Sequence, residues 1–446
     1  MPSVLRNRTY RRLFAAQVVA LVGTGLATVA LSLLAYDIAD GNASAVLGTA
    51  LAIKMVAYVV VAPAVVAITD RMPHRALMVT ADLTRASVAL TLPFVTQVWQ
   101  TYLLILLLQA ASAAFTPTFQ ATIPVVLPAE RDYTQALSMS RLAYDLESLF
   151  SPALAAALLT LVPYGWLFTG TAAGFLASAA LVGAAVLPRR APVERAGGGC
   201  ARAAYGIRRF LATPRLRALL ALDLAVAAAG ALVFVDTVEL VRDHFHRPAA
   251  AVSLALGAYG AGSMLAALQL PRLLRSCTDR AVMLPAARAL PVVLAAVAAL
   301  TAAAPAGWSW YGILAAWALI GAACSAVSTP GGRVLRRCTA DAELPAAFAA
   351  RFSLAHGCWL LTYPLAGLLA AGAGLPVTAA VLGGVALAAA VAATALWPAR
   401  GDEPEDPVRG ARGARDTAPH GHAPAATRAP GSSRIRGAGR PVARGA

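Results

Sequence analysis

The sequence predicts an all-α integral membrane protein with twelve transmembrane helices in two pseudo-symmetric bundles of six. Three observations lead to this fold class. The 446-residue chain is 59% hydrophobic and only 13% charged, which is more apolar than a soluble domain. It contains apolar runs of about 20 residues, the length of a helix that crosses a bilayer. Short motifs of its first half also recur in its second half.

The apolar runs follow one another with short polar turns between them. They span residues 13–37, 46–68, 76–96, 101–126, 137–162, 165–187, 214–237, 250–273, 281–304, 308–329, 346–371 and 374–397. The first run follows basic residues, as in a signal peptide, but it is about twice as long as the apolar region of such a peptide. We therefore interpret it as a retained first helix.

Two segments interrupt this apolar pattern. Residues 188–213 are basic and contain three consecutive glycines, which predicts a cytoplasmic linker. The linker would join an N-terminal bundle, residues 1–187, to a C-terminal bundle, residues 214–398. Residues 399–446 are mostly Pro, Gly, Ala and Arg with little to bury, which predicts a disordered basic tail in the cytoplasm.

Arginines predict the orientation of the chain in the cell membrane. They gather in alternate connections, which are the N-terminus, the loop after the second run, the linker, and the loop with Arg333, Arg336 and Arg337. Because basic loops stay in the cytoplasm, these connections and both termini are expected there. The net charge of +16 then follows from loops and tail facing the lipid headgroups, and no nucleic acid is expected as a partner.

Several classes of site are excluded. The five cysteines show no CxxC spacing, and no pair falls on the outer side, so neither a disulfide nor a zinc site is expected. Lys54 is the only lysine and has no Gly-rich loop around it, which excludes a Walker-type ATP site. No HExxH, GxSxG or Asp-rich motif is present. We therefore expect no enzyme, no catalytic residue, no metal and no cofactor.

Proline motifs repeat between the two halves. Phe115-Thr116-Pro117 recurs as Ser328-Thr329-Pro330, and Ser151-Pro152 recurs as Tyr363-Pro364, at offsets of 213 and 212 residues. Arg75-Ala76-Leu77-Met78 likewise recurs as Arg280-Ala281-Val282-Met283. The repeats predict a duplicated architecture. They also mark the points at which helices are expected to bend, which are Pro117, Pro152, Pro330 and Pro364.

The charged loop between the second and third runs resembles the Gly-x-x-x-Asp-Arg-x-Gly-Arg-Arg signature of the major facilitator superfamily. Asp70, Arg71 and Arg75 stand in its charged positions, while Val66 and Pro73 replace its glycines. The resemblance extends over residues from about 10 to 397 and implies two six-helix bundles related by a pseudo-two-fold axis along the membrane normal. It also implies a cytoplasmic gate at the three charged residues. The alternative is that the two arginines only keep the loop in the cytoplasm.

Three further stretches are similar to the exporter branch that includes enterobactin exporters and macrolide efflux proteins. They are Ala81 to Ala86, Phe115 to Pro124, and Leu142 to Leu154, in which Ser151 replaces a usual glycine. The resemblance implies proton-coupled export of a small amphiphilic molecule, such as a drug, a siderophore or a secondary metabolite, by alternating access. An importer of the same fold and a non-transporting membrane sensor are the alternatives.

Ionisable residues inside apolar runs are costly, so each is a functional candidate. Asp82 and Arg85 share one face of the third run, and Asp145 and Glu147 lie at a similar depth in the fifth, so that Arg85 is within reach of an acid there. Because the two acids are two positions apart, they point in different directions, and we expect one to be structural and one to carry the proton. The sequence does not choose between them. Fixed ion pairs of both acids with Arg85 or Arg141 are the alternative.

The remaining candidates are expected in or beside a central cavity. The side chain of Lys54 in the second run can extend outward toward Asp37, so a structural role beside that acid and a substrate role are both open. His356 of the eleventh run aligns with Tyr144 of the fifth across the repeat, and Phe119 is an aromatic candidate for the cavity wall. We expect a monomer whose partners are a small-molecule substrate, protons and the lipid bilayer.

Overall fold

The computed structural model describes residues 2–38, 53–64, 72–163, 165–187, 199–248, 250–303 and 307–397. The chain divides into two units, Met1–Asp402 and Glu403–Ala446, and every described residue belongs to the first. All regular elements among the described residues are helices. The predicted tail and residues 188–198 of the predicted linker lie outside the described residues.

The helices of the first half, together called the first set, arise from the first six apolar runs. They are α2 (Arg8–Ile38), the helix Ile53–Ala64, α4 (His74–Thr91) with the short η1 (Leu92–Phe94), α5 (Val98–Val126), α6 (Glu130–Leu159) and α7 (Gly165–Gly183). A short α1 (Pro2–Leu5) precedes them. Only residues 53–64 of the second run are described.

The second half gives the second set of helices. They are α9 (Pro214–Glu239) with the π-helical η2 (Leu240–His244), α10 (Ala250–Ser276), α11 (Asp279–Ala302), α12 (Gly307–Ser328), α14 (Leu344–Ala373) and α15 (Leu375–Leu396). Shorter helices connect them to one another and to the first set: α8 (Gly199–Ala212), α13 (Gly331–Cys338) and η3 (Asp341–Glu343). Helix α8 occupies more than half of the predicted linker.

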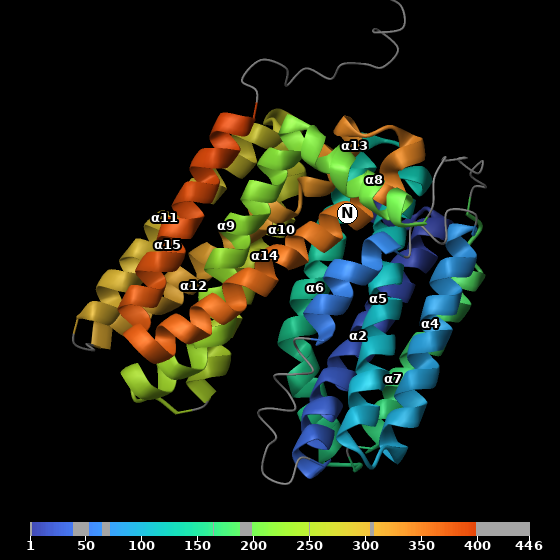
Figure 1. Cartoon of the computed structure of the whole chain (residues 1–446), viewed down its shortest axis with the longest axis horizontal. Helices are drawn as coiled ribbons and strands as arrows, with labels where there is room; N and C mark the ends of the chain where they lie inside the picture. Colours follow the sequence, from blue (N-terminus) through green and yellow to red (C-terminus); the bar gives the residue numbers. More distant parts are fainter. Residues whose placement is uncertain are drawn as a thin grey trace, which may run out of the picture. The chain divides into compact units, whose positions relative to one another are not determined.

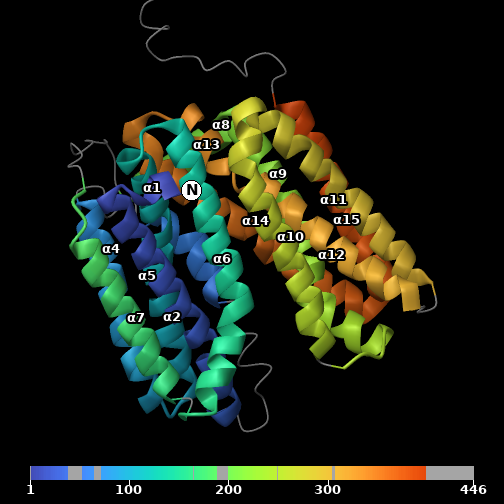
Figure 2. The ribbon, with the colours of Figure 1, turned by 180° about the vertical axis from the view of Figure 1, so that it is seen from behind.

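Within each set the helices pack on their neighbours, as Figures 1 and 2 show. Helix α2 contacts α6 and α7, α4 contacts α5 and α7, and α9 contacts α14 and α15, while α10 and α11 both contact α12. The two sets touch where α6 meets α10 and where α5 meets α14. The end that carries α8 and α13 also holds the chain's N-terminus.

Prolines end helices or lie inside them. Pro117 lies inside α5 and Pro364 inside α14, and Pro152 falls within the range of α6. Their role in bending these helices stays a prediction. Pro330 differs from the prediction, because it precedes α13 as the residue at its N-cap and separates that helix from α12. A proline cannot donate the backbone hydrogen bond that would continue α12, so the chain breaks there rather than bends.

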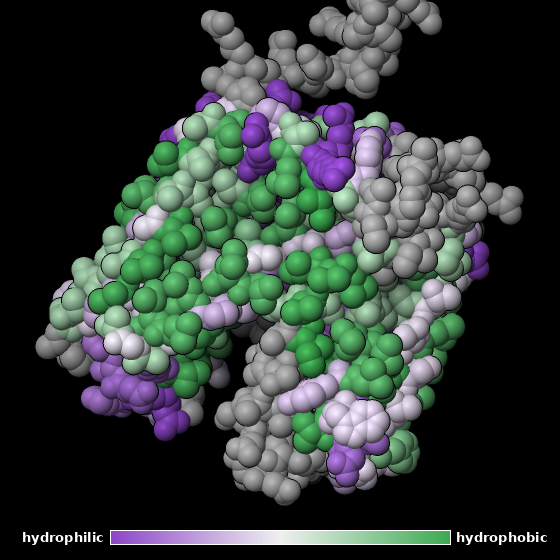
Figure 3. All heavy atoms as spheres, viewed as in Figure 1, coloured by the Kyte–Doolittle hydropathy of each residue, from purple (hydrophilic) through white to green (hydrophobic). Residues whose placement is uncertain are grey.

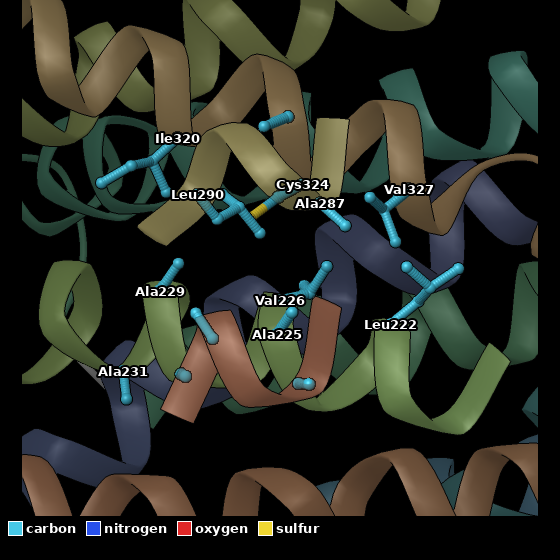
Figure 4. Packing of buried hydrophobic residues seen from close by; sticks show 14 of the residues in the cluster. Leu222, Ala225, Val226, Ala229, Ala231, Ala287, Leu290, Ile320, Cys324 and Val327 are labelled. Carbon is cyan, nitrogen blue, oxygen red and sulfur yellow. The ribbon is translucent and has the colours of Figure 1, made fainter. Parts of the chain in front are cut away.

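Small residues allow the helices of the second set to approach closely. Figure 4 shows Ala225 and Ala229 of α9, Ala287 of α11 and Cys324 of α12 in one buried cluster. Where α10 crosses α12, a Cβ added to Gly321 would overlap the carbonyl oxygen of Tyr259. Such close backbone contacts are typical of helices that pack in a membrane.

On the face that Figure 3 shows, the surface of the described helices is largely apolar, and hydrophilic residues gather toward the helix ends. Leu361 and Leu368 of α14 are more than 70% exposed, which suits lipid rather than water as the solvent. Eight helical segments of the described residues are long and apolar enough to cross a membrane, namely α5, α7, α9 with η2, α10, α11, α12 with α13, α14 and α15. The twelve-span layout in two bundles of six stays a prediction.

Candidate functional site

A cavity of about 490 Å³ lies between the two sets of helices. Its wall comes from α2, α5, α6 and the helix Ile53–Ala64 on one side, and from α9, α10, α14 and the junction of α12 with α13 on the other. Aromatic and aliphatic side chains make up much of the wall. The wall also contains two ion pairs between ionisable side chains. This volume and mixed lining are typical of sites for small organic molecules.

The first ion pair lies within α6 and is linked to α10 by a serine. Arg141 Nε lies 3.1 Å from Asp145 Oδ1 on the same helix, and Arg141 Nη2 donates to Ser263 Oγ of α10 at 2.9 Å. Ser263 in turn donates to Asp145 Oδ2 at 2.6 Å. Asp145 is therefore held by partners on both sets of helices.

The second ion pair joins α9 to α14. Arg351 donates through Nη2 and Nε to the two carboxylate oxygens of Asp223, at 3.1 and 3.3 Å. The guanidinium lies directly over Gly331 at the start of α13, where an added Cβ would overlap it. Glycine at that position therefore leaves the space in which Arg351 lies.

Glu147 is in a different environment from Asp145. Among the residues that the structure describes, Glu147 accepts no hydrogen bond and forms no ion pair, although the charge of Lys54 acts on it. Both side chains are partly buried, and Lys54 Nζ lies 5.8 Å from the centre of the Tyr58 ring. The side chain of Asp37, the other predicted neighbour of Lys54, is outside the described residues.

Asp82 and Arg85 form a third ion pair, within α4. Both are buried, and Ser178 of α7 donates to Asp82 Oδ2 at 2.7 Å. The Arg85 guanidinium lies 4.5 Å from the ring centres of Phe115 and of Phe175. The expectation that Arg85 pairs with an acid of the fifth run is not met, because Asp82, one helical turn away, already occupies it.

Aromatic side chains bring the helix Ile53–Ala64 against α14. The Tyr58 ring packs edge-on against His356, at 4.7 Å between ring centres, and His356 Nδ1 lies 2.7 Å from the carbonyl oxygen of Phe352. His356 and Tyr144, which the repeat aligns, both line the cavity, as does Phe119. The structure thus brings these three sequence candidates together.

A charged network connects the two sets at the end that carries α13. Arg333 lies 2.8 Å from Glu130 of α6 and 3.0 Å from Asp279 of α11, and it donates to Thr134 at 2.6 Å. Arg337 pairs with the same two acids. We call these five residues the closing network, because they join α6 to α11 and α13 beside the cavity.

Tyr133 lies next to the closing network. The guanidinium of Arg336 lies 5.4 Å from the centre of its ring, and burial raises the pKa of the Tyr133 hydroxyl, so this group stays neutral. Arg336 also donates to the carbonyl oxygen of Pro128 at 2.8 Å. These contacts extend the junction between α6 and α13 without adding a negative charge.

The predicted gate is described only in part. Asp70 and Arg71 lie outside the described residues, and Arg75 is exposed at the start of α4. Its neighbour His74 lies 3.1 Å from Thr122 of α5 through Nδ1. A gating role for Asp70, Arg71 and Arg75 therefore stays a prediction.

Sequence reasoning missed Asp223, Arg351 and the closing network. Asp223 and Arg351 are ionisable residues inside predicted spans, and the rule that selected Asp145 would have selected them too. Arg333 and Arg337 were assigned only to orientation. Their second role is to form ion pairs with acids at this end of the helices. The sequence indicates it only through Asp279, an acid that directly precedes the repeated motif starting at Arg280.

Comparisons with known proteins place this fold. The chain is similar to the human organic anion transporter MFSD10 (TETRAN), with 13% identity and a TM-score of 0.70 over 86% of this chain and 99% of that one. It is also similar to the E. coli transporter FucP in its outward conformation, with 12% identity and a TM-score of 0.68 over 87% and 98%.

A third similar structure is a bacterial homologue of the iron transporter ferroportin in an outward-facing state, with 15% identity and a TM-score of 0.68 over 87% and 99% of the two chains. At such identities these likenesses show the fold alone. No curated protein matches the chain.

The sequence profile described as Major Facilitator Superfamily matches residues 13–239, slightly more than half of the chain. Members of this family are multi-pass membrane proteins that carry small molecules and are not enzymes. On that match, and with the fold and cavity described above, the chain belongs to the Major Facilitator Superfamily and is a secondary transporter.

Proposed function

We propose that this transporter exports a small amphiphilic molecule in exchange for protons, and that Glu147 carries the proton. The contrast between two acids on α6 is the observation that carries the proposal. Asp145 is held by Arg141 and Ser263, whereas Glu147 has no hydrogen-bonding partner among the described residues. A partly buried carboxyl without a fixed partner is the one that can gain and lose a proton during a transport cycle.

The export direction rests on the resemblance of α4, α5 and α6 to drug and siderophore exporters. The lining of the cavity supports an amphiphilic substrate, since it contains both aromatic rings, such as those of Tyr58, Phe352 and Trp359, and ion pairs. Rings of this kind bind apolar bodies while polar neighbours orient them.

The orientation predicted from arginines puts the closing network on the cytoplasmic side. The cavity would then be closed toward the cytoplasm in this structure, and release of substrate to the outside would follow proton entry. In this scheme both termini lie in the cytoplasm, Asp70, Arg71 and Arg75 belong to the cytoplasmic gate, and the protein acts as a monomer in the cell membrane.

Inside-out vesicles with an acidified interior test this function. Addition of a transported drug or siderophore is expected to release protons from vesicles that hold the wild-type protein. Glu147→Gln should abolish this proton release but keep the exchange of labelled for unlabelled substrate, because the amide imitates the protonated carboxyl.

Asp145→Asn is the matched comparison, on the same helix and with the same change of chemistry. It should retain coupled proton release at a reduced rate, since its carboxyl serves the contact with α10. Full proton release by Glu147→Gln would exclude Glu147 as the carrier. Substrate movement without proton movement in every vesicle would exclude antiport.

A further inference from the structure

The two arginines that line the cavity present more of their surface to it than their acid partners do. The side chain of Arg141 is 23% exposed and that of Asp145 is 6% exposed. In the second pair, Arg351 is 16% exposed and Asp223 is 8% exposed. Each ion pair is neutral as a whole, and in both pairs the arginine is the more exposed member of the two that line the cavity.

Each carboxylate oxygen of the acids in these pairs already has a partner. Asp223 receives one hydrogen bond from Arg351 on each carboxylate oxygen. Asp145 is contacted by Arg141 at Oδ1 and by Ser263 at Oδ2. A positively charged ligand would have to share these carboxylates with a guanidinium, whose positive charge repels it.

The arginines, in contrast, retain donors. Arg351 uses Nε and Nη2 for Asp223 and for the carbonyl oxygen of Ser328, and among the described residues its Nη1 has no partner. A guanidinium carries five N–H donors in a planar fork that suits carboxylates, sulfonates and phosphates. Its remaining edge therefore suits an anionic group of a ligand.

A second, independent feature of the cavity wall also indicates a polar group on the ligand. Thr329, at the junction of α12 and α13, is 6% exposed, and its hydroxyl has no hydrogen-bonding partner among the described residues. Thr329 lines the same cavity as Arg351. A buried hydroxyl is rarely left without a partner, and a ligand oxygen would supply one.

We propose that the substrate class of this transporter is organic anions with an apolar body, bound with the anionic group at Arg351 and Arg141. One guanidinium comes from each set of helices, so the anion lies between the two halves of the protein. The body of the ligand packs against Phe352 and Trp359 of α14. This substrate class rests on the proposed function in one respect, namely that this cavity is the substrate site.

The test compares three ligands of the same shape and different charge on the full chain in lipid nanodiscs at neutral pH. The probes are 2-naphthoate, 2-naphthamide and 2-naphthylmethylamine, and calorimetry measures their affinities. The naphthoate is expected to bind about tenfold more tightly than the amide, because a charge-assisted hydrogen bond replaces a neutral one. The amine should bind most weakly.

Variants of Arg351 test whether this arginine causes the preference for naphthoate. Arg351→Gln should reduce the affinity for naphthoate about tenfold and leave that for naphthamide unchanged, while Arg351→Lys restores part of the loss. Arg288→Gln is the matched control, because Arg288 also lies in a long apolar helix but donates to Thr394 of α15, away from the cavity. It should leave all three affinities unchanged.

Equal affinities for the three probes, tighter binding of the amine, or no binding by any of them would overturn the proposal. These comparisons on the wild-type protein decide the matter even if a variant does not fold. Preference for naphthoate together with proton release by Glu147→Gln would remove the proposed coupling but keep the anion site. Coupled proton release with equal affinities would remove the anion site alone.

Discussion

At the scale of single residues, the ion pair of Asp82 with Arg85 is enclosed completely. Asp82 is fully buried and Arg85 is 4% exposed, between Phe115 and Phe175. A buried charge is stable only with its partner, since removal of one member leaves the other desolvated and unpaired. This environment favours a structural role for a pair that the sequence offered for proton coupling.

Asp82→Ala is therefore expected to destabilise the protein by about 3–5 kcal/mol, because it strands the Arg85 guanidinium. The double variant Asp82→Ala with Arg85→Met should recover much of that loss, since a methionine fills the space between the two rings without a charge. Thermal unfolding of the detergent-solubilised protein measures both. Equal stability of the single and double variants would contradict a structural pair.

At the scale of helices, the contact of α10 with α12 positions Ser263, which contacts the ion pair of α6. Gly262 and Gly321 bring the two backbones together, so that an added Cβ at Gly262 would overlap the carbonyl oxygen of Ala318. Helix α10 carries Ser263, whose hydroxyl joins Asp145 to Arg141. The glycines thus fix a helix that reaches across to the first set.

Gly321→Ala is expected to cost about 1–3 kcal/mol, because the methyl group pushes α10 away from α12. It should also weaken the contact of Ser263 with Asp145. Gly257→Ala is a suitable control on α10, since nothing lies within 4 Å of the added methyl. Melting temperatures of the two variants, measured side by side, check the prediction, and an equal effect of both would refute it.

The helices of this protein could be predicted from the sequence far better than its contacts. Apolar runs predicted the positions of α9 to α12, α14 and α15 because lipid selects for length and hydropathy, which are local properties. The environments of Asp145 and Glu147 could not be distinguished from the sequence, since one partner of Asp145 is Ser263, 118 residues away. The pairing of Arg351 with Asp223 across 128 residues is equally invisible in local sequence.

Two predictions from the sequence, those for Arg85 and Pro330, differ from the structure because residues close by in the sequence decide the outcome. Arg85 meets Asp82 on its own helix before it can reach α6, as residues three apart on a helix are neighbours. Pro330 was predicted to bend a helix, but two glycines follow it and the chain starts a separate helix there. Glycines after a proline are a local signal for such a break.

At the scale of the whole transporter, the closing network holds the two sets together beside the cavity. Arg333 is buried, with its side chain 7% exposed, whereas that of Arg337 is 37% exposed. The ion pair of Arg333 with Asp279 is therefore screened less by water and salt than the ion pairs of Arg337. Arg333 is therefore expected to contribute more than Arg337 to the closed state.

Arg333→Gln should shift the population toward a state that is open at this end, and Arg337→Gln should shift it less. Distances between spin labels at Arg131 and Ser276, one on each set, measure the opening by electron paramagnetic resonance. Arg275→Gln, which removes an exposed arginine at the end of α10, should leave the distances unchanged. A larger effect of Arg337→Gln than of Arg333→Gln would contradict the ranking.

The break at Pro330 brings two distant tasks onto one short stretch of backbone. Gly331 supports the guanidinium that faces the cavity, and Arg333, two residues later, belongs to the closing network. A movement of one displaces the other through only two peptide bonds. Coupling between two equilibria is reciprocal. If a bound ligand shifts the balance between the open and closed states of this end, the same shift changes the affinity of the protein for that ligand by an equal free energy. The first turn of α13 thus belongs both to the proposed substrate site and to the closing network, so the proposed coupling of the two needs no long relay.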